Sequence, residues 1–209
     1  MLNFDDLWLV RTNPENINRL KEFLENDIIA IGWSNLIDLT DMPKNTLLKE
    51  LARNNYSCSN VKLGVINQFV KNIQVGDLCI IPYGDKIYLA KVTSPYYYDS
   101  TKVAEGYPHQ RKVEFINKDN PISRSSLPEA VRKSLGAQNY VAHLKHRIGE
   151  FKAFLTELET TTDNIDLHES LIKLLPLALE TIRNAMESDD VQRRFDASIE
   201  VLKLIQKYE

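Results

Sequence analysis

The chain has 209 residues, of which 43% are hydrophobic and 26% are charged, a balance typical of a globular protein with room for one sizeable domain and an appendage. Its two cysteines, Cys58 and Cys79, predict no disulfide framework and favour a reducing, cytoplasmic setting. No apolar run approaches the roughly 18 residues that span a membrane, and the acidic start is unlike a signal peptide.

Short strands and helices follow one another irregularly over the first 145 residues. Apolar runs bounded by turn residues predict strands, and apolar residues at helical spacing predict helices. An Asn-Pro pair at residues 13–14 is typical of a helix start, and Gly136 of a helix end. We expect strands at 5–12, 27–34 and 111–117, a hairpin over 75–98 that turns at 83–86, and helices at 13–26, 41–55, 59–73 and 126–136.

From about residue 148 the pattern changes to helical spacing with almost no strand signal. The run TTTD at 160–163 predicts a break between helices, and Pro176 a kink. We therefore expect two regions, 1–147 and 148–209. The fold class is α+β, a small β-barrel with flanking helices followed by a C-terminal helical hairpin.

Charge is distributed unevenly along the chain. Residues 1–147 hold 19 Lys and Arg against 16 Asp and Glu, a net +3, whereas 148–209 hold 7 against 13, a net −6. Within the first region, 102–147 hold 9 against 4, a net +5. A basic stretch permits a nucleic-acid partner, although a solvated surface with local imbalance explains the same numbers.

Most enzyme signatures are absent from the sequence. It has no glycine-rich phosphate loop, no G-x-S-x-G and no H-E-x-x-H. His143 and His146 have no cysteine or acidic partner at ligand spacing and are typical of the end of a surface helix. Glu150 and Lys152 have the spacing of some nuclease sites, but their segment is helical. We expect no catalytic residue, no metal and no cofactor.

Three consecutive tyrosines follow the predicted hairpin. Because successive side chains of a strand point to opposite faces, Tyr96 and Tyr98 continue one packed face. Tyr97 points the other way and is free to line a pocket.

The order of motifs over residues 7–144 resembles the EVE family of PUA-like domains, of the kind found with prokaryotic Mrr-type modification-dependent restriction systems. A helix ends at Val75-Gly76-Asp77, leads into a hairpin, and the hairpin closes with Tyr97, Asp99 and Thr101. This resemblance implies a PUA-like barrel that binds DNA and reads a modified base.

A reader of modified bases must take the base out of the duplex stack and hold it in a pocket. Such a pocket needs aromatic faces, polar groups for the base edge, and basic residues for the phosphates. The candidates for the base pocket are Trp33, Ser34, Asn67, Tyr83 and Tyr97. The candidates for phosphate contacts are Lys62, Arg111, Lys112 and Arg124. Trp33 is equally well read as a core residue, because tryptophan is highly buried on average.

The C-terminal helices carry an apolar stripe of Phe195, Ile199, Leu202 and Ile205. Such a stripe must be covered, so we expect it to form a homo-oligomer or to dock a partner subunit. We expect a non-catalytic reader of flipped, modified bases in DNA for restriction or phage defence, with any nuclease supplied by a partner. Two alternatives stay open: a regulatory adaptor that binds proteins through a PUA-like barrel, and a PUA-like module that binds RNA.

Overall fold

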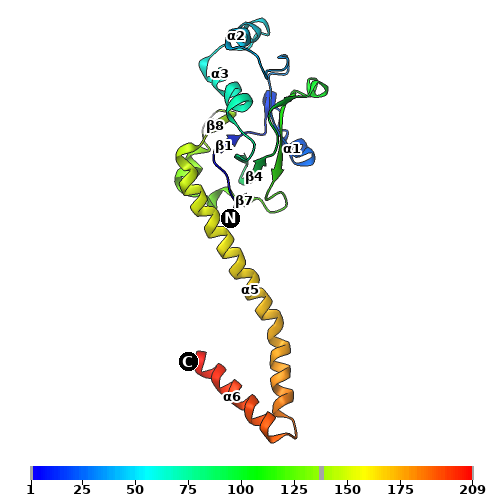
Figure 1. The fold of residues 1–209 in the computed structure, drawn as a ribbon, viewed down its shortest axis with the longest axis vertical. Coiled ribbons are helices and arrows are strands. Elements are labelled where there is room, and N and C mark those ends of the chain that lie inside the picture. The colour runs from blue at the N-terminus through cyan, green and yellow to red at the C-terminus, as the bar shows by residue number, and fades with distance from the viewer. Residues whose placement is uncertain (1, 137–138, 209) are drawn as a thin grey trace. The chain divides into compact units, whose positions relative to one another are not determined.

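A computed structural model of the chain describes residues 2–136 and 139–208, without the side chains of 161–175, 200 and 202–208. It divides into two compact units, Met1–Leu155 and Thr156–Glu209. The first unit contains the described strands and the second is helical (Figure 1). The expected boundary at 147/148 coincides with the first residue of the longest described helix, Ile148–Met186, whose first two turns belong to the first unit.

Eight described strands form one mixed sheet that curls into a half-barrel. Along the sheet the order is β2-β6-β4-β3-β1-β8, with β5 paired to β6 and β7 to β4. The pair β1–β3 is parallel and the other pairs are antiparallel. The strands are β1 (Leu7–Val10), β2 (Ile28–Ile31), β3 (Leu78–Tyr83), β4 (Lys86–Val92), β5 (Tyr97–Tyr98), β6 (His109–Phe115), β7 (Ile122–Ser123) and β8 (Val141–His143).

Helices flank this sheet, and α2 and α3 lie together at one end of the first unit (Figure 1). A π-helical turn, Gln68–Asn72, continues α3. The helices of the first unit are α1 (Leu20–Asn26), α2 (Lys44–Arg53), α3 (Asn60–Asn67) and α4 (Glu129–Ser134). The long helix α5 (Ile148–Met186) passes into the second unit, where α6 (Val191–Tyr208) follows.

The core of the first unit lies against strands that are buried along their whole length. All four residues of β1 and all four of β2 are buried, as expected for strands covered on both faces. Trp8 of β1 donates its indole N–H to the buried carboxylate of Asp77 at 2.8 Å. Phe151, in the first turn of α5, is also fully buried. Its burial explains why the first unit extends to Leu155.

The expected α+β class and most of the expected elements are confirmed. The hairpin pairs Tyr83 with Lys86 and so turns at the expected residues. Ser59 caps α3 by accepting a hydrogen bond from the amide of Lys62 at 3.3 Å. Tyr96 and Tyr98 lie on one face as expected, because both rings contact the ring of His109.

Three expectations were wrong. The helix expected at 13–26 begins only at Leu20, because the backbone at Glu15 has φ 48° and cannot continue a helix. The break expected at 160–163 does not exist, and α5 continues through Pro176. His143 belongs to β8, where its ring stacks on Trp8 with centroids 4.2 Å apart, and so does not lie at a helix end.

The second unit exposes apolar side chains on both of its helices. Leu177, Val191 and Phe195 are between 60% and 70% exposed. A hollow of about 470 Å³ lies between α5 and α6, with Ile182, Ala197 and Ile199 in its lining. Leu202 and Ile205 of the expected stripe lie outside the described side chains. Within the described residues, every helix is too short or too polar to cross a lipid bilayer.

Candidate functional site

An aromatic cavity of about 110 Å³ lies where four distant segments of the first unit meet. This volume equals about four water molecules at roughly 30 Å³ each, on the scale of one six-membered ring and well below a drug-sized site. Its lining consists of three aromatic rings, one carboxylate, one amine, one amide and two small residues. We call it the aromatic cavity, and it is lined by Pro14, Glu15, Asn16, Gly32, Trp33, Tyr56, Lys62 and Tyr140.

The carboxylate of Glu15 organises the cavity. Its Oε1 atom accepts hydrogen bonds from the backbone amide of Ser34 at 3.0 Å and from the hydroxyl of Tyr56 at 3.3 Å. Its Oε2 atom has no hydrogen-bond or ion-pair partner among the described residues. One oxygen therefore fixes the side chain, and the other is available to accept a hydrogen bond from a ligand.

Close approach of Glu15 to the end of β2 requires a glycine. A Cβ atom on Gly32 would lie 2.9 Å from the backbone nitrogen of Glu15 and 3.0 Å from its Oε1. Gly106, with φ +85°, faces the same side chain, and a Cβ there would lie 3.2 Å from the Cγ of Glu15. Larger residues at either position would displace the carboxylate.

Backbone strain is concentrated in the lining of this cavity. Glu15, Asn16 and Trp33 have φ of 48°, 62° and 62°, the left-handed region that non-glycine residues rarely adopt. Such a conformation costs about 1–3 kcal/mol per residue and persists only where the surroundings impose it. Strain of this kind is typical of functional sites, which makes the cavity the best candidate in the first unit.

A buried histidine holds Trp33 in its strained conformation. His109 of β6 is fully buried, and its Nε2–H donates to the carbonyl oxygen of Trp33 at 3.2 Å. Its Nδ1 atom then accepts from the hydroxyl of Tyr96 at 2.7 Å. Acceptance at Nδ1 needs a neutral ring, and burial lowers the pKa of His109 to about 4. The same carbonyl also accepts from the amide of Leu36 at 2.8 Å.

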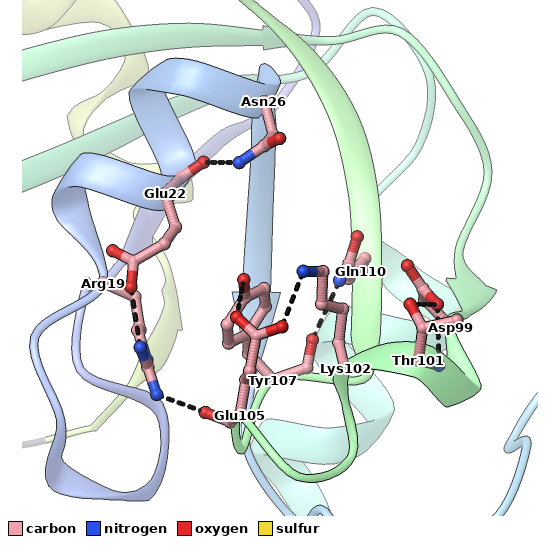
Figure 2. A network of polar contacts seen from close by, with 9 residues as sticks. All are labelled: Arg19, Glu22, Asn26, Asp99, Thr101, Lys102, Glu105, Tyr107 and Gln110. Carbon is pink, nitrogen blue, oxygen red and sulfur yellow. Dashed lines mark hydrogen bonds and ion pairs between the residues drawn. The ribbon is translucent and has the colours of Figure 1, made fainter.

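A polar network fastens the segment that carries Glu15 to the loop before β6 (Figure 2). Arg19 forms an ion pair with Glu22 and donates to the carbonyl oxygen of Glu105. Glu105 in turn binds Lys102 and the hydroxyl of Tyr107, each at 2.7 Å. The guanidinium of Arg19 lies 5.2 Å from the centre of the Tyr107 ring, within range of a cation–π contact.

The aromatic walls of the cavity are set at a steep angle. The rings of Trp33 and Tyr140 meet edge to face, with centroids 6.5 Å apart and planes at 73°. The hydroxyl of Tyr140 donates to the side-chain carbonyl of Asn16 at 2.7 Å. Burial raises the pKa of Tyr56, and the nearby charge of Glu15 raises it further, so this phenol is a neutral donor at physiological pH.

A second, larger hollow lies on the other side of α3. We call it the helical groove; its volume is about 540 Å³, within the usual range of ligand sites. Its lining is apolar at the base with two lysines and two asparagines, and contains no acidic residue. The lining residues are Leu39, Met42, Lys44, Leu47, Asn60, Leu63, Gly64, Ile66, Asn67, Val70 and Lys71.

The structure brings together only part of the expected base pocket. Trp33 lines the aromatic cavity, and the amide of Ser34 holds Glu15 beside it. Asn67 lies in the helical groove instead. The expected common pocket for Trp33 and Tyr97 was wrong, because the hydroxyl of Tyr97 donates to the side chain of Gln110 outside the cavity lining.

Tyr83 is not part of the cavity either. It lies at the end of β3, with 44% of its surface exposed, beside the hairpin turn.

Among the expected phosphate contacts, Lys62 lines the aromatic cavity and has no ion-pair partner among the described residues. Lys112 is exposed and donates to the carbonyl oxygen of Asn26 at 3.3 Å, and Arg124 is half-buried. Neither lines the cavity or the groove.

Arg111 was misassigned as a phosphate contact. It is 2% exposed, and its guanidinium donates to the carbonyl oxygens of Phe69, Val70 and Ser94 at 2.8–3.2 Å. Burial lowers its pKa to about 10, so it stays protonated at neutral pH. Phe69 and Val70 belong to the turn that continues α3. Arg111 therefore fastens the end of α3 to the sheet.

Sequence reasoning missed Glu15, Asn16, Tyr56 and Tyr140. The segment NPEN at 13–16 was read as a helix start, and two left-handed residues in it were not foreseen. An Asn next to a Pro-Glu pair does permit a turn, because asparagine tolerates φ above zero. Tyr56 and Tyr140 carry no signal of their own, since each reaches the cavity only through the tertiary fold.

The motif residues behind the family resemblance have structural roles here. Asp77 accepts from Trp8 and from the amide of Gln74, and Gly76 before it has φ +97°. Asp99 accepts from both the amide and the hydroxyl of Thr101, which closes a turn. These residues shape the hairpin and the loop that follows it.

The part of the chain that the structure describes contains no group of three or more His, Cys, Asp or Glu side chains able to hold a metal ion. The aromatic cavity holds one carboxylate oxygen without a partner among the described residues, one amine, and two tyrosine hydroxyls that already donate to Glu15 and Asn16. This arrangement suits the binding of a small planar group that carries an N–H donor.

The family model of a domain of unknown function, DUF8426, matches residues 8–138, and the chain belongs to this family. Among solved structures, the chain is similar to the crystal structure of protein Atu2648 from Agrobacterium tumefaciens. The two are 16% identical, with a TM-score of 0.35, over 72% of this chain and 90% of the other. No curated protein matches the chain.

Proposed function

We propose that this member of the DUF8426 family is a non-catalytic reader of a modified base flipped out of DNA, and that the aromatic cavity receives the base. The observation that carries the proposal is the strained, aromatic-lined cavity with one unpaired carboxylate oxygen. Aromatic rings stack on bases at about 1–3 kcal/mol per base. A half-buried carboxylate oxygen that accepts a hydrogen bond selects bases that present an amine.

The acceptor narrows the choice of base. Carboxylates accept from the exocyclic amine of cytosine, and adenine presents an amine of the same kind. Thymine has a carbonyl oxygen at that position, which Glu15 would repel. The cavity, at about 110 Å³, is closer in scale to one ring than to two. We therefore favour a modified cytosine, with modified adenine as the next candidate.

The wider setting is part of the same proposal. The curled α+β sheet supports a PUA-like, EVE-like barrel, and such modules accompany Mrr-type restriction systems. In a restriction or phage-defence role, the chain recognises the base and a partner subunit supplies the nuclease.

The test is binding of the purified chain to oligonucleotides with and without modified cytosine or adenine, over a series of salt concentrations. We expect tighter binding to one modified oligonucleotide, and Glu15→Gln should reduce that preference about tenfold or more, since one base contact is worth about 1–3 kcal/mol. Glu114→Gln is the matched control, because Glu114 is exposed on β6. Equal binding to all oligonucleotides, modified or not, would contradict the proposal.

A second candidate is a regulatory adaptor that binds proteins. The exposed apolar side chains of the second unit, among them Leu177 and Phe195, favour it. The same oligonucleotide series separates the candidates, because an adaptor binds none of them. A preference for RNA over DNA of the same sequence would favour the RNA-binding alternative.

A further inference from the structure

The helix α3 is a shared wall between the aromatic cavity and the helical groove. Lys62 lines the cavity, whereas Asn60, Leu63 and Gly64 line the groove. Eight residues of helix span about 12 Å at 1.5 Å per residue, the length of three to four nucleotide steps of 3.4 Å. The helix is therefore long enough to lie against the nucleotides next to a base that enters the cavity.

Positive charge surrounds this wall. Residues 42–76 hold five Lys and Arg against one Asp or Glu, a net +4. Lys44 and Lys71 border the groove, Lys62 borders the cavity, and none of the three has an ion-pair partner among the described residues. The lining of the groove contains no acidic residue. Lysines without an ion-pair partner can bind phosphates, and the apolar floor of the groove can contact unstacked nucleobases.

Gly64 keeps one part of the groove lining free of a side chain. It lies inside α3, where glycine is less favourable than alanine by about 1 kcal/mol. A Cβ atom there would meet no heavy atom within 4 Å, so packing within the chain does not require a glycine. The missing side chain leaves the groove open for the close approach of another molecule.

We propose that the helical groove binds the DNA strand next to the flipped base, and that Lys44 and Lys71 of the groove and Lys62 beside the aromatic cavity contact its phosphates. This inference rests on the proposed function, because it places the same strand that delivers a base to the aromatic cavity. This proposal places the phosphate contacts outside residues 102–147, the basic stretch in which Arg111 is buried. Phosphate contacts give affinity for every sequence, whereas the cavity gives the preference for one base.

The test uses the full chain and duplex DNA at several salt concentrations. The double variant Lys44→Gln/Lys71→Gln should weaken binding to modified and unmodified DNA alike. It should also reduce the salt slope, the steepness with which the logarithm of the binding constant falls with the logarithm of salt concentration. The expected reduction is about 1.8, at roughly 0.9 per phosphate contact on duplex DNA. The rival variant Lys112→Gln/Arg124→Gln should leave the slope unchanged.

A second variant tests the groove without removing charge. Gly64→Leu should keep or raise the unfolding midpoint, because leucine favours a helix and its Cβ would meet no heavy atom within 4 Å, yet it should weaken DNA binding about tenfold. The matched control is Gly149→Leu, since Gly149 lies in α5 with equally open space over its Cβ. If Gly64 has only a structural role, Gly64→Leu should leave the affinity for DNA unchanged.

The outcomes separate the two proposals. If the unmodified chain binds DNA with a base preference but the groove variants keep its affinity and salt slope, the groove inference is wrong and the reader function stands. A lower slope in the Lys112→Gln/Arg124→Gln variant would also overturn it. If the unmodified chain binds no DNA, both proposals fail together.

Discussion

Two basic stretches of the first unit have similar net charge but differ in how many of their cations have partners within the protein. Residues 102–147 carry +5 and residues 42–76 carry +4. In the first stretch most cations are already engaged, by carboxylates or by carbonyl oxygens; examples are Lys102, Arg111, Lys118, Lys133 and Arg147. In the second, Lys44, Lys62 and Lys71 have no ion-pair partner among the described residues. A lysine or arginine without a partner is available to bind a phosphate, and net charge does not show whether a partner is present.

The largest expected effect concerns the buried cation. Arg111→Met should lower the free energy of unfolding by about 4 kcal/mol, because three carbonyl oxygens lose a charged donor in a buried site. The neighbouring Lys112→Met should change it by less than about 0.5 kcal/mol, since Lys112 is exposed. Urea unfolding of both variants measures the difference. Equal effects would mean that Arg111 does not fasten α3.

The next effect is a pH dependence of stability from the same strand. His109 is neutral in the folded chain because its pKa is lowered from 6.5 to about 4. Between pH 6.5 and 4 the unfolded state binds a proton that the folded state does not, so stability falls as the pH falls through this window. The full loss is about 3 kcal/mol, at 1.36 kcal/mol per pH unit.

Other groups titrate in the same range, so the measurement is a difference between two proteins. Urea unfolding of the unmodified chain and of His109→Gln at pH 7 and pH 4.5 isolates the histidine. The variant should lose less stability on acidification than the unmodified chain. Parallel curves for the two would show that His109 accepts a proton in the folded state.

Apolar side chains differ in the same way between the two units, since Phe195 of the second unit is 60% exposed whereas Phe151 of the first unit is fully buried. If Phe195 packs against a second copy of the chain, burial of its ring contributes about 1.5–3 kcal/mol to the free energy of association. Phe195→Glu should then weaken self-association at least tenfold, measured by sedimentation, and leave the unfolding of the first unit unchanged. A monomer at all concentrations before mutation would instead favour docking to a different partner.

The sequence was sufficient for the fold class because local patterns determine it. Alternating and helical apolar spacing located most of the strands and helices. The strand β8 was missed because three residues give too short a pattern. The continuous α5 was missed because a threonine run and Pro176 weaken helical propensity without ending the helix.

The candidate site was less predictable, because its residues converge only in three dimensions. Trp33 and Lys62 were foreseen from their residue types, and both line the aromatic cavity. Glu15 was not, because its role depends on two left-handed backbone positions and on a glycine 17 residues further along the chain. Tyr97 was placed in the pocket because it points to the opposite face of the strand from Tyr96 and Tyr98. The alternation of a strand predicts the face on which a ring lies, but it does not predict whether that face borders a pocket.

The smallest expected effect is the sharpest test of the comparison between the two basic stretches. Lys133 pairs with Glu129 one turn earlier in α4 at 2.6 Å, the favourable orientation for such a pair. Both side chains are well exposed, so Lys133→Gln should cost only about 0.3 kcal/mol of stability. It should also leave the salt slope of DNA binding unchanged, because a carboxylate already neutralises this lysine.

Lys71→Gln removes the same charge from an unpaired position and should reduce the slope by about 0.9. The two variants have the same change of net charge and the same new side chain, so net charge cannot explain a difference between them. If both reduce the slope equally, phosphates would have to compete with Glu129 for Lys133, and pairing would no longer distinguish the two stretches.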